Sequence, residues 1–212
     1  MNLKMILVPA LITLAVTLLR LVGELQHWST RLFNPAAGGG GALIGIVWLV
    51  PIFGVYFALK LAGRGEGPTK PWRPVGLALL AFAFNSAALA LAVFLKLSIA
   101  ATLSLFAVTS WLAIFIAYKG WPALGKTLLA YGLAARIPVV LVMLVAIFGS
   151  WGTHYDLPPP DAPEVGAMAP LVKWFWIGLL PQLTIWIYVT VVGGILFGSI
   201  AAAIAARRSA TA

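Results

Sequence analysis

Long apolar stretches, separated by short polar connections, dominate the chain from one end to the other. Each stretch approaches or exceeds the roughly 20 residues that a helix needs to cross the hydrocarbon core of a bilayer. The pattern therefore predicts an all-α integral membrane protein, with about six transmembrane helices in one polytopic membrane domain over residues 1–212. The expected helices cover approximately residues 5–22, 43–62, 75–95, 98–118, 123–148 and 174–205.

Charged residues in the connections predict the topology. Basic residues gather after the second, fourth and last apolar stretches, and cytoplasmic loops of membrane proteins favour Lys and Arg. We therefore expect a cytoplasmic loop at 63–74, outer loops at 23–42 and 149–173, and both termini in the cytoplasm. The inner side then holds Lys60, Arg64, Lys70, Arg73, Lys119, Lys126, Arg207 and Arg208, and the outer side holds Glu24, Asp156, Asp161 and Glu164.

Composition supports the membrane interpretation. The chain is 62% hydrophobic and only 9% charged, whereas soluble domains average about half apolar and a quarter charged residues. Its formal net charge of +9 comes from basic residues between apolar runs, so topology explains it. We expect the lipid bilayer as a partner, no nucleic acid, and a place in a bacterial-type cytoplasmic membrane.

The first apolar stretch begins like a secretory signal peptide, with Lys4 before an apolar run. No small-x-small cleavage motif follows this run, so we expect it to be retained as a helix. The chain has no cysteine, which excludes disulfides, thiolate metal sites and catalytic thiols.

Arg136 is the most informative single residue, because it falls near the middle of the fifth stretch. A charged side chain at such a depth costs about 2.5–3.5 kcal/mol on insertion scales unless it faces a partner or a wet cavity. Gly125 and Gly132 precede it on the same helix face, so we predict that Arg136 points inward over a face of low bulk. In the alternative, the span begins only at Pro138, which would leave about 21 Å of helix before Trp151.

A polar stripe follows the first helix and continues beyond it. Its spacing of three and four residues places the members on one face of a continuous helix. The stripe is either the wall of a vestibule that faces the bundle interior, or the emerging end of a helix with an Arg20–Glu24 ion pair at the interface. Its members are Thr13, Thr17, Arg20, Glu24, His27 and Arg31.

Two further polar residues lie within apolar segments, Asn85 in the third and Gln182 in the last. They either join Arg136 in a central polar site or bond neighbouring helices together. Pro51, Pro138 and Pro181 interrupt the second, fifth and last segments, as in transporters with discontinuous helices.

Glycines mark two features. Gly38–Gly41 is either an anion-binding nest, built from exposed backbone N–H groups, or a flexible loop. The pairs Gly41/Gly45 and Gly194/Gly198 have the spacing that permits close helix contact, within the chain or between copies.

Candidate chemistry at the outer face is limited to four residues, His27, His154, Asp156 and Glu24. Two imidazoles and two carboxylates have the ligand types of a divalent metal site or of acid–base catalysis. Their spacing matches no metal motif, so we predict no metal, no cofactor and no catalytic residue.

Three functional interpretations remain open. The favoured one is a small transporter or channel-like protein, in which Arg136, Arg20, Glu24, Asn85 and Gln182 line a cavity for an anionic small molecule or lipid headgroup. The second is a non-catalytic subunit or assembly protein that forms a homo-oligomer or a membrane complex. The third is a membrane-embedded enzyme acting at the outer face.

Overall fold

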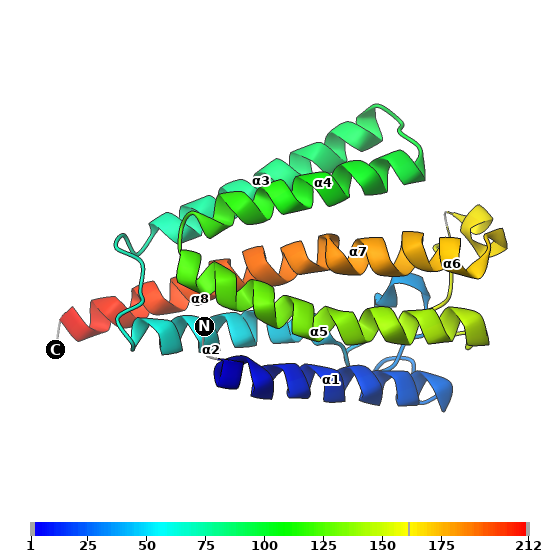
Figure 1. The fold of residues 1–212 in the computed structure, drawn as a ribbon, viewed down its shortest axis with the longest axis horizontal. Coiled ribbons are helices and arrows are strands. Elements are labelled where there is room, and N and C mark those ends of the chain that lie inside the picture. The colour runs from blue at the N-terminus through cyan, green and yellow to red at the C-terminus, as the bar shows by residue number, and fades with distance from the viewer. Residues whose placement is uncertain (1–2, 161, 211–212) are drawn as a thin grey trace.

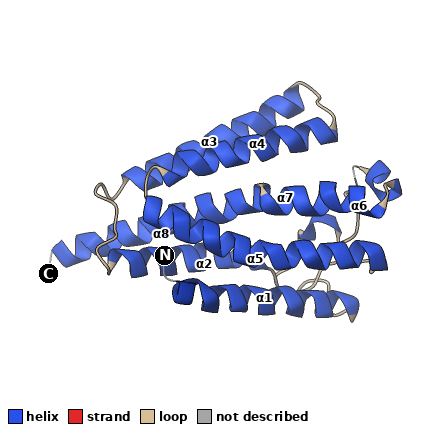
Figure 2. Cartoon of the chain, in the orientation of Figure 1, coloured by secondary structure: helices blue, strands red, loops and turns tan. Residues whose placement is uncertain are grey.

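The computed structural model describes residues 3–160 and 162–210, and helices form most of this part of the chain, with no strand in it (Figures 1 and 2). Within these described residues, five helices are long and apolar enough to cross a membrane, which supports the predicted membrane protein. The α-helices are α1 (Leu3–Leu25), α2 (Leu49–Ala62), α3 (Arg73–Phe94), α4 (Ile99–Tyr118), α5 (Pro122–Gly149), α6 (Pro170–Lys173), α7 (Leu180–Leu183) and α8 (Ile185–Ala210).

The described residues also contain four helical elements of other types. The 3-10 helices are η1 (Ala37–Gly39), η2 (Ile46–Trp48) and η3 (Pro163–Ala167), and η4 (Trp174–Leu179) is π-helical. The second apolar segment differs from expectation, because α2 begins only at Leu49 and η2 extends it to the shorter apolar helix Ile46–Ala62. The expected 43–62 helix is therefore too long at its beginning.

Local sequence explains several helix ends. Ser98 caps α4 by accepting a hydrogen bond from the Ala101 amide at 3.3 Å. Proline stands in the first turn of both α3 and α5, where its missing N–H leaves no helical bond unmade. Ser150 ends α5 in the left-handed conformation at φ 50°.

The α2–α8 contact forms the closest packing in the bundle. A Cβ added at Gly54 of α2 would lie 2.7 Å from the backbone of Gly194, and one at Gly198 would lie 2.5 Å from the Gly54 carbonyl oxygen. The Gly194/Gly198 pair thus serves helix contact within the chain. Gly41 and Gly45 lie outside the helices, so the helix-contact interpretation of that pair is wrong.

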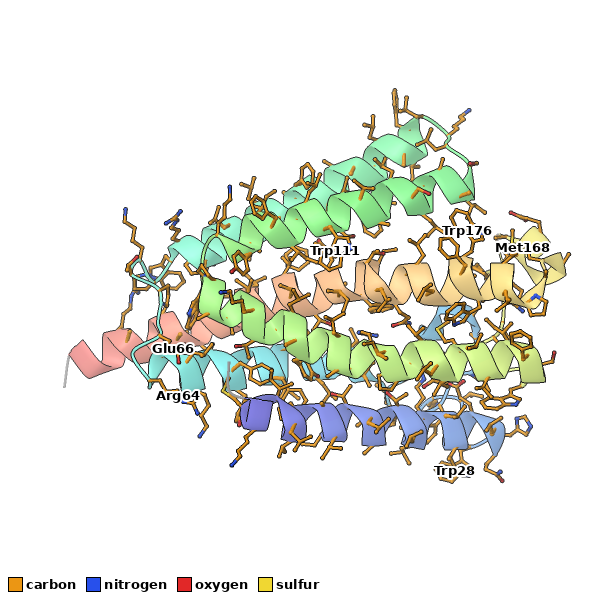
Figure 3. The ribbon with its side chains drawn as sticks, in the orientation of Figure 1. Trp28, Arg64, Glu66, Trp111, Met168 and Trp176 are labelled. Atoms are coloured by element: carbon orange, nitrogen blue, oxygen red, sulfur yellow. The ribbon has the colours of Figure 1, made fainter. Side chains whose placement is uncertain are left out.

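The bundle has two distinct ends. The beginning of α1 and the end of α8 point toward the same end of the bundle, and the end of α8 extends further (Figure 1). Arg64 and Glu66 lie at this same end, whereas Met168 and Trp176 lie at the other (Figure 3). The polar loops that follow α1 and α5 also lie at the end away from the termini, and they build the site described below.

The polar stripe of the first helix divides at the end of α1. Thr13, Thr17, Arg20 and Glu24 are buried and face the bundle. The helix ends at Leu25, and His27 follows with a positive φ of 51°. A continuous helix to Arg31 is therefore wrong, and both His27 and Arg31 are exposed.

Candidate functional site

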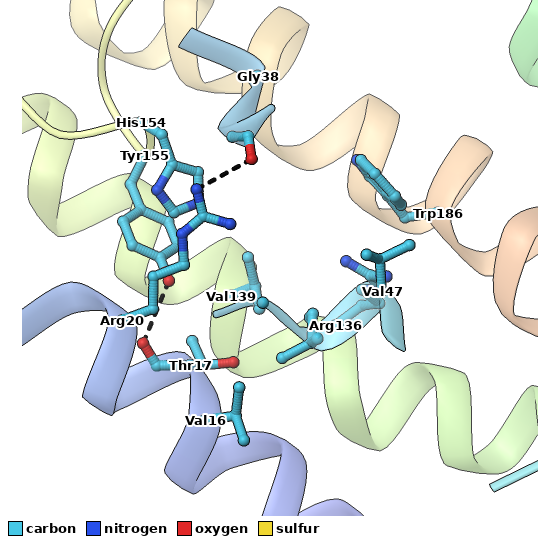
Figure 4. A pocket seen from close by; sticks show the side chains of 13 residues that line it. Val16, Thr17, Arg20, Gly38, Val47, Arg136, Val139, His154, Tyr155 and Trp186 are labelled. Atoms are coloured by element: carbon cyan, nitrogen blue, oxygen red, sulfur yellow. Dashed lines mark hydrogen bonds between the residues drawn. The ribbon is translucent and has the colours of Figure 1, made fainter. Parts of the chain in front are cut away.

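A cavity of about 90 Å³ lies between five segments of the chain. These are α1, the loop that contains Gly38–Gly41 and leads into η2 (the glycine loop), α5, the loop after α5 that contains His154 (called the outer loop for its predicted side), and α8. We call this cavity the arginine pocket, because Arg20 and Arg136 both line it, together with His154, Gly39 and Trp186 among others (Figure 4). Its residues come from five separate regions of the sequence, so only the folded bundle brings them together.

Arg136 carries an uncompensated charge in this pocket. Its side chain is buried, with a residue exposure of 4%. Nη1 donates to Oε1 of Gln182 at 3.2 Å, and the guanidinium lies 4.7 Å from the ring centre of Trp186. Nε is buried without a hydrogen-bond partner, and no carboxylate of the described residues lies within 4.0 Å of Arg136. A buried cation of this kind is stabilised by an anion.

Arg20, by contrast, is already neutralised. Its Nε donates to Oε1 of Glu24 at 2.8 Å, and the Glu24 side chain is fully buried. The same carboxylate accepts hydrogen bonds from the backbone N–H of His154 at 3.0 Å and from Nδ1 of His154 at 2.6 Å. Glu24 therefore joins the end of α1 to the outer loop and leaves Arg136 as the unbalanced charge of the pocket.

The glycine loop wraps around Arg20. Nη2 of Arg20 donates to the carbonyl oxygens of Asn34 at 3.1 Å and Gly39 at 3.0 Å. Gly38 and Gly39 have positive φ values of 74° and 71°, a conformation that glycine adopts without strain. The loop thus holds a cation through its carbonyls, which is the opposite of the anion-binding nest considered from the sequence.

The outer loop is fixed by its own hydrogen bonds. Asp156 accepts from the backbone N–H groups of Gly152 and Thr153 and from the Thr153 hydroxyl. The Tyr155 hydroxyl donates to the Thr17 carbonyl at 3.2 Å, which fixes the loop over α1. This arrangement presents the His154 ring to the pocket.

Burial controls the ionisation of this loop. It lowers the pKa of His154, and the positive charge of Arg20 acts in the same direction, while the hydrogen bond that His154 donates to Glu24 opposes them. Burial also raises the pKa of Tyr155. At neutral pH the imidazole is therefore uncharged, and Nδ1 carries the proton that it donates to the Glu24 carboxylate.

The sequence candidates thus divide between several places. Arg136 and Gln182 are hydrogen-bonded to each other, as the alternative of a central polar site required. Arg20 lines the same pocket, and Glu24 lies beside the pocket as the partner of Arg20. Asn85 belongs elsewhere, because it donates to Ser110 and accepts from Thr109 on α4.

The four outer candidates do not form one cluster. Glu24 meets His154, whereas His27 is exposed and Asp156 is committed to the backbone of its own loop. In the described part of the chain no three His, Asp or Glu residues are placed to hold a metal ion.

Sequence reasoning missed Trp186, Tyr155 and the role of Gly39 in the pocket. An aromatic residue in an apolar segment resembles ordinary membrane-helix composition, so no local signal marks Trp186 as the partner of Arg136. Comparison with models of known protein families, with curated proteins and with solved structures finds no match, so the functional argument depends on the pocket itself.

Proposed function

We propose that the protein binds a small anionic group in the arginine pocket and moves it across the membrane, as a small transporter or channel-like protein. The observation that carries this proposal is the buried guanidinium of Arg136, which has an unpartnered Nε and no carboxylate within 4.0 Å among the described residues. An anion in the pocket would supply both the missing charge and the missing acceptor.

The size of the pocket limits what it holds. Its volume of about 90 Å³ exceeds the roughly 10–15 Å³ that a single water molecule requires. This space suits a carboxylate or a phosphate group, and is well below the roughly 300–1,000 Å³ of pockets for drug-sized ligands.

Helix interruptions beside Arg136 favour transport over static binding. Pro138 lies inside α5, two residues beyond Arg136. On the facing segment, π-helical η4 leads to α7, and the non-helical Thr184 separates α7 from α8. Gln182, the partner of Arg136, lies between these irregularities. Interrupted helices near mid-membrane ligand sites are typical of transporters, and π-turns often occur at functional sites.

The proposed topology has six spans with both termini in the cytoplasm of a bacterial-type cell. Ile46–Ala62, the second segment in chain order, would be the one short span among the six, at about 25 Å of helix. Local thinning of the bilayer accommodates such a length. Single cysteines at Glu66 and Glu164 test this, because the chain has no native cysteine. A membrane-impermeant thiol reagent added outside whole cells should label Glu164→Cys and spare Glu66→Cys, and the reverse would overturn the orientation.

Binding is tested with acetate and inorganic phosphate as probes. Each should raise the thermal-unfolding midpoint of the purified protein in a concentration-dependent way, because a ligand of the folded state stabilises it. Arg136→Gln should abolish this rise without lowering the midpoint of the free protein, since it removes an unpaired buried charge. Lys126→Gln is the matched control, as an exposed cation on the same helix, and should respond like the wild type.

Transport is tested separately, by uptake of radiolabelled phosphate into proteoliposomes. Uptake above protein-free vesicles that disappears in Arg136→Gln would support the proposal. Anion binding without uptake would overturn the transport role, and absence of both would favour a structural subunit in which Arg136 only packs.

A further inference from the structure

The arginine pocket has an apolar side as well as a charged one. Val16, Ile46, Val47 and Val139 line it together with the Trp186 ring. A pocket for a free aqueous anion gains nothing from such a wall, because an anion loses its hydration next to apolar groups. Apolar lining beside a single buried cation suits a molecule that is itself both charged and apolar.

The apolar side continues onto the outer surface of the bundle. Val47 lines the pocket and is also 42% exposed. Its neighbours Trp48 and Leu43 are 59% and 62% exposed. In a membrane-embedded chain, exposed apolar side chains of this kind face lipid, so Val47 stands between the pocket and the bilayer.

The pocket extends along α1 well away from the end of this helix. Val16, on the pocket wall, lies nine residues before the end of α1 at Leu25, or about 14 Å along the helix axis. This distance is about half of the roughly 30 Å thickness of the hydrocarbon core.

The wall at this opening has no regular helix. Regular α2 begins only at Leu49, and the chain before it is the single 3-10 turn of η2. Gly45 precedes this turn without a side chain, and a Cβ placed there would lie 3.2 Å from Nη1 of Arg20. The side of the pocket toward Val47 is therefore formed by a 3-10 turn and not by a regular helix.

We propose that the ligand of the arginine pocket is an anionic amphiphile with one negative charge, whose headgroup contacts Arg136 and whose alkyl chain passes Val47 into the bilayer. This inference rests on the proposed function, and it replaces a free aqueous anion by a lipid or fatty acid carrying the same charged group. One charge matches the pocket, because Glu24 already neutralises Arg20. The ligand then enters sideways from the membrane.

Laurate and acetate are the matched probes, since both present a carboxylate and only laurate has a long chain. The apparent Kd of each is obtained from the ligand dependence of the thermal-unfolding midpoint in a neutral detergent. Wild-type protein should bind laurate at least tenfold more tightly than acetate. Arg136→Gln should weaken laurate binding at least tenfold, which separates the headgroup contact from partition of the chain into detergent.

Val47→Trp tests the route of the chain by filling the opening. It should weaken laurate binding at least tenfold, and it should weaken laurate binding more than acetate binding, because only laurate has a chain that must pass Val47. Leu43→Trp, which places the same side chain at an exposed residue four positions before Val47 and outside the pocket lining, should leave both unchanged. Val47→Phe replaces the tryptophan variant if its yield is low.

Each result decides between the sources of the charged group. Equal affinities for laurate and acetate would overturn the amphiphile and leave the anion site intact. Laurate binding that Arg136→Gln does not weaken would also overturn it, because the chain would then only partition into detergent. Laurate binding that Val47→Trp does not weaken would overturn it too, because the chain would then take a different route. If neither probe binds the wild type, the proposed function itself fails.

Discussion

Glu24 and His154 lie 130 residues apart in the chain, yet Oε1 of Glu24 is 2.6 Å from Nδ1 of His154. The same oxygen accepts from Nε of Arg20 at 2.8 Å. A single buried carboxylate thus pairs with a cation on its own helix and with a neutral imidazole on the outer loop. This contact fixes the loop that closes the arginine pocket.

Glu24→Gln should destabilise the protein strongly. The substitution keeps the size of the side chain but leaves the guanidinium of Arg20 without its counter-charge, and breaking a buried ion pair typically costs about 3–5 kcal/mol. A clear fall in the thermal-unfolding midpoint of the purified protein is expected. Glu164→Gln, which changes an exposed acid of the outer loop, should leave the midpoint nearly unchanged. Equal midpoints for the two variants would show that the pair contributes little.

Stability should fall as the pH drops below about 6.5, because of His154. Burial lowers the pKa of this imidazole in the folded protein, so the unfolded chain takes up a proton at a pH where the folded protein does not. As the pH falls from the pKa of His154 in the unfolded chain to its lower pKa in the folded protein, protonation of the unfolded chain increasingly favours unfolding. Above both pKa values this loss of stability is absent.

His154→Asn isolates this effect, because its amide still donates to Glu24 but does not titrate. The variant should show a smaller loss of stability between pH 7 and pH 5 in thermal-unfolding measurements. Arg20, Glu24 and Asp156 around the site, and the exposed His27, are present in both proteins. Parallel pH profiles for the two proteins would exclude His154 as the source.

Gly54→Ala should weaken the α2–α8 contact. The added methyl group would lie 2.7 Å from both Cα and the carbonyl oxygen of Gly194, so the two backbones must separate, at a cost of about 1–3 kcal/mol. Gly76→Ala is the control, because a Cβ at Gly76 on α3 meets no atom within 4 Å and alanine favours helix. Thermal unfolding should show a lower midpoint for the first variant only, and a raised midpoint for Gly54→Ala would contradict the close approach.

The helical membrane fold was predictable because it depends on long apolar runs, which are a local property of the sequence. The inward direction of Arg136 was also predictable, from the cost of exposing a charge to lipid. Its partner Gln182 was one of two alternatives considered from the sequence, whereas its partner Trp186 was not considered. Trp186 and Gln182 meet Arg136 only through the packing of α5 against a segment with a π-turn and a break at Thr184. No spacing rule in the sequence places these irregularities.

The end of α1 illustrates the same limit. The spacing from Thr13 to Arg31 fits one continuous helix, and nothing local to His27 forbids it. The chain instead turns after Leu25, because tertiary contacts decide the outcome there. Glu24 is held by Arg20 and His154, and the chain beyond it returns to place Gly39 on Arg20. Contacts between distant segments of this kind cannot be derived from periodicity.

Gly39→Ala should damage the arginine pocket more than any neighbouring glycine substitution. Gly39 has φ +71°, which costs an alanine about 1–2 kcal/mol. The new Cβ would also lie 2.8 Å from Cδ2 of His154 and 3.2 Å from Nη2 of Arg20. Both side chains must move, so the acetate affinity measured by midpoint shifts should fall at least fivefold. Gly40→Ala is the matched control, because its φ of −69° suits any residue and its Cβ meets no atom within 4 Å. Unchanged acetate binding in Gly39→Ala would mean that the glycine loop does not shape the site, and equal losses in both variants would indicate a general effect of stiffening the loop.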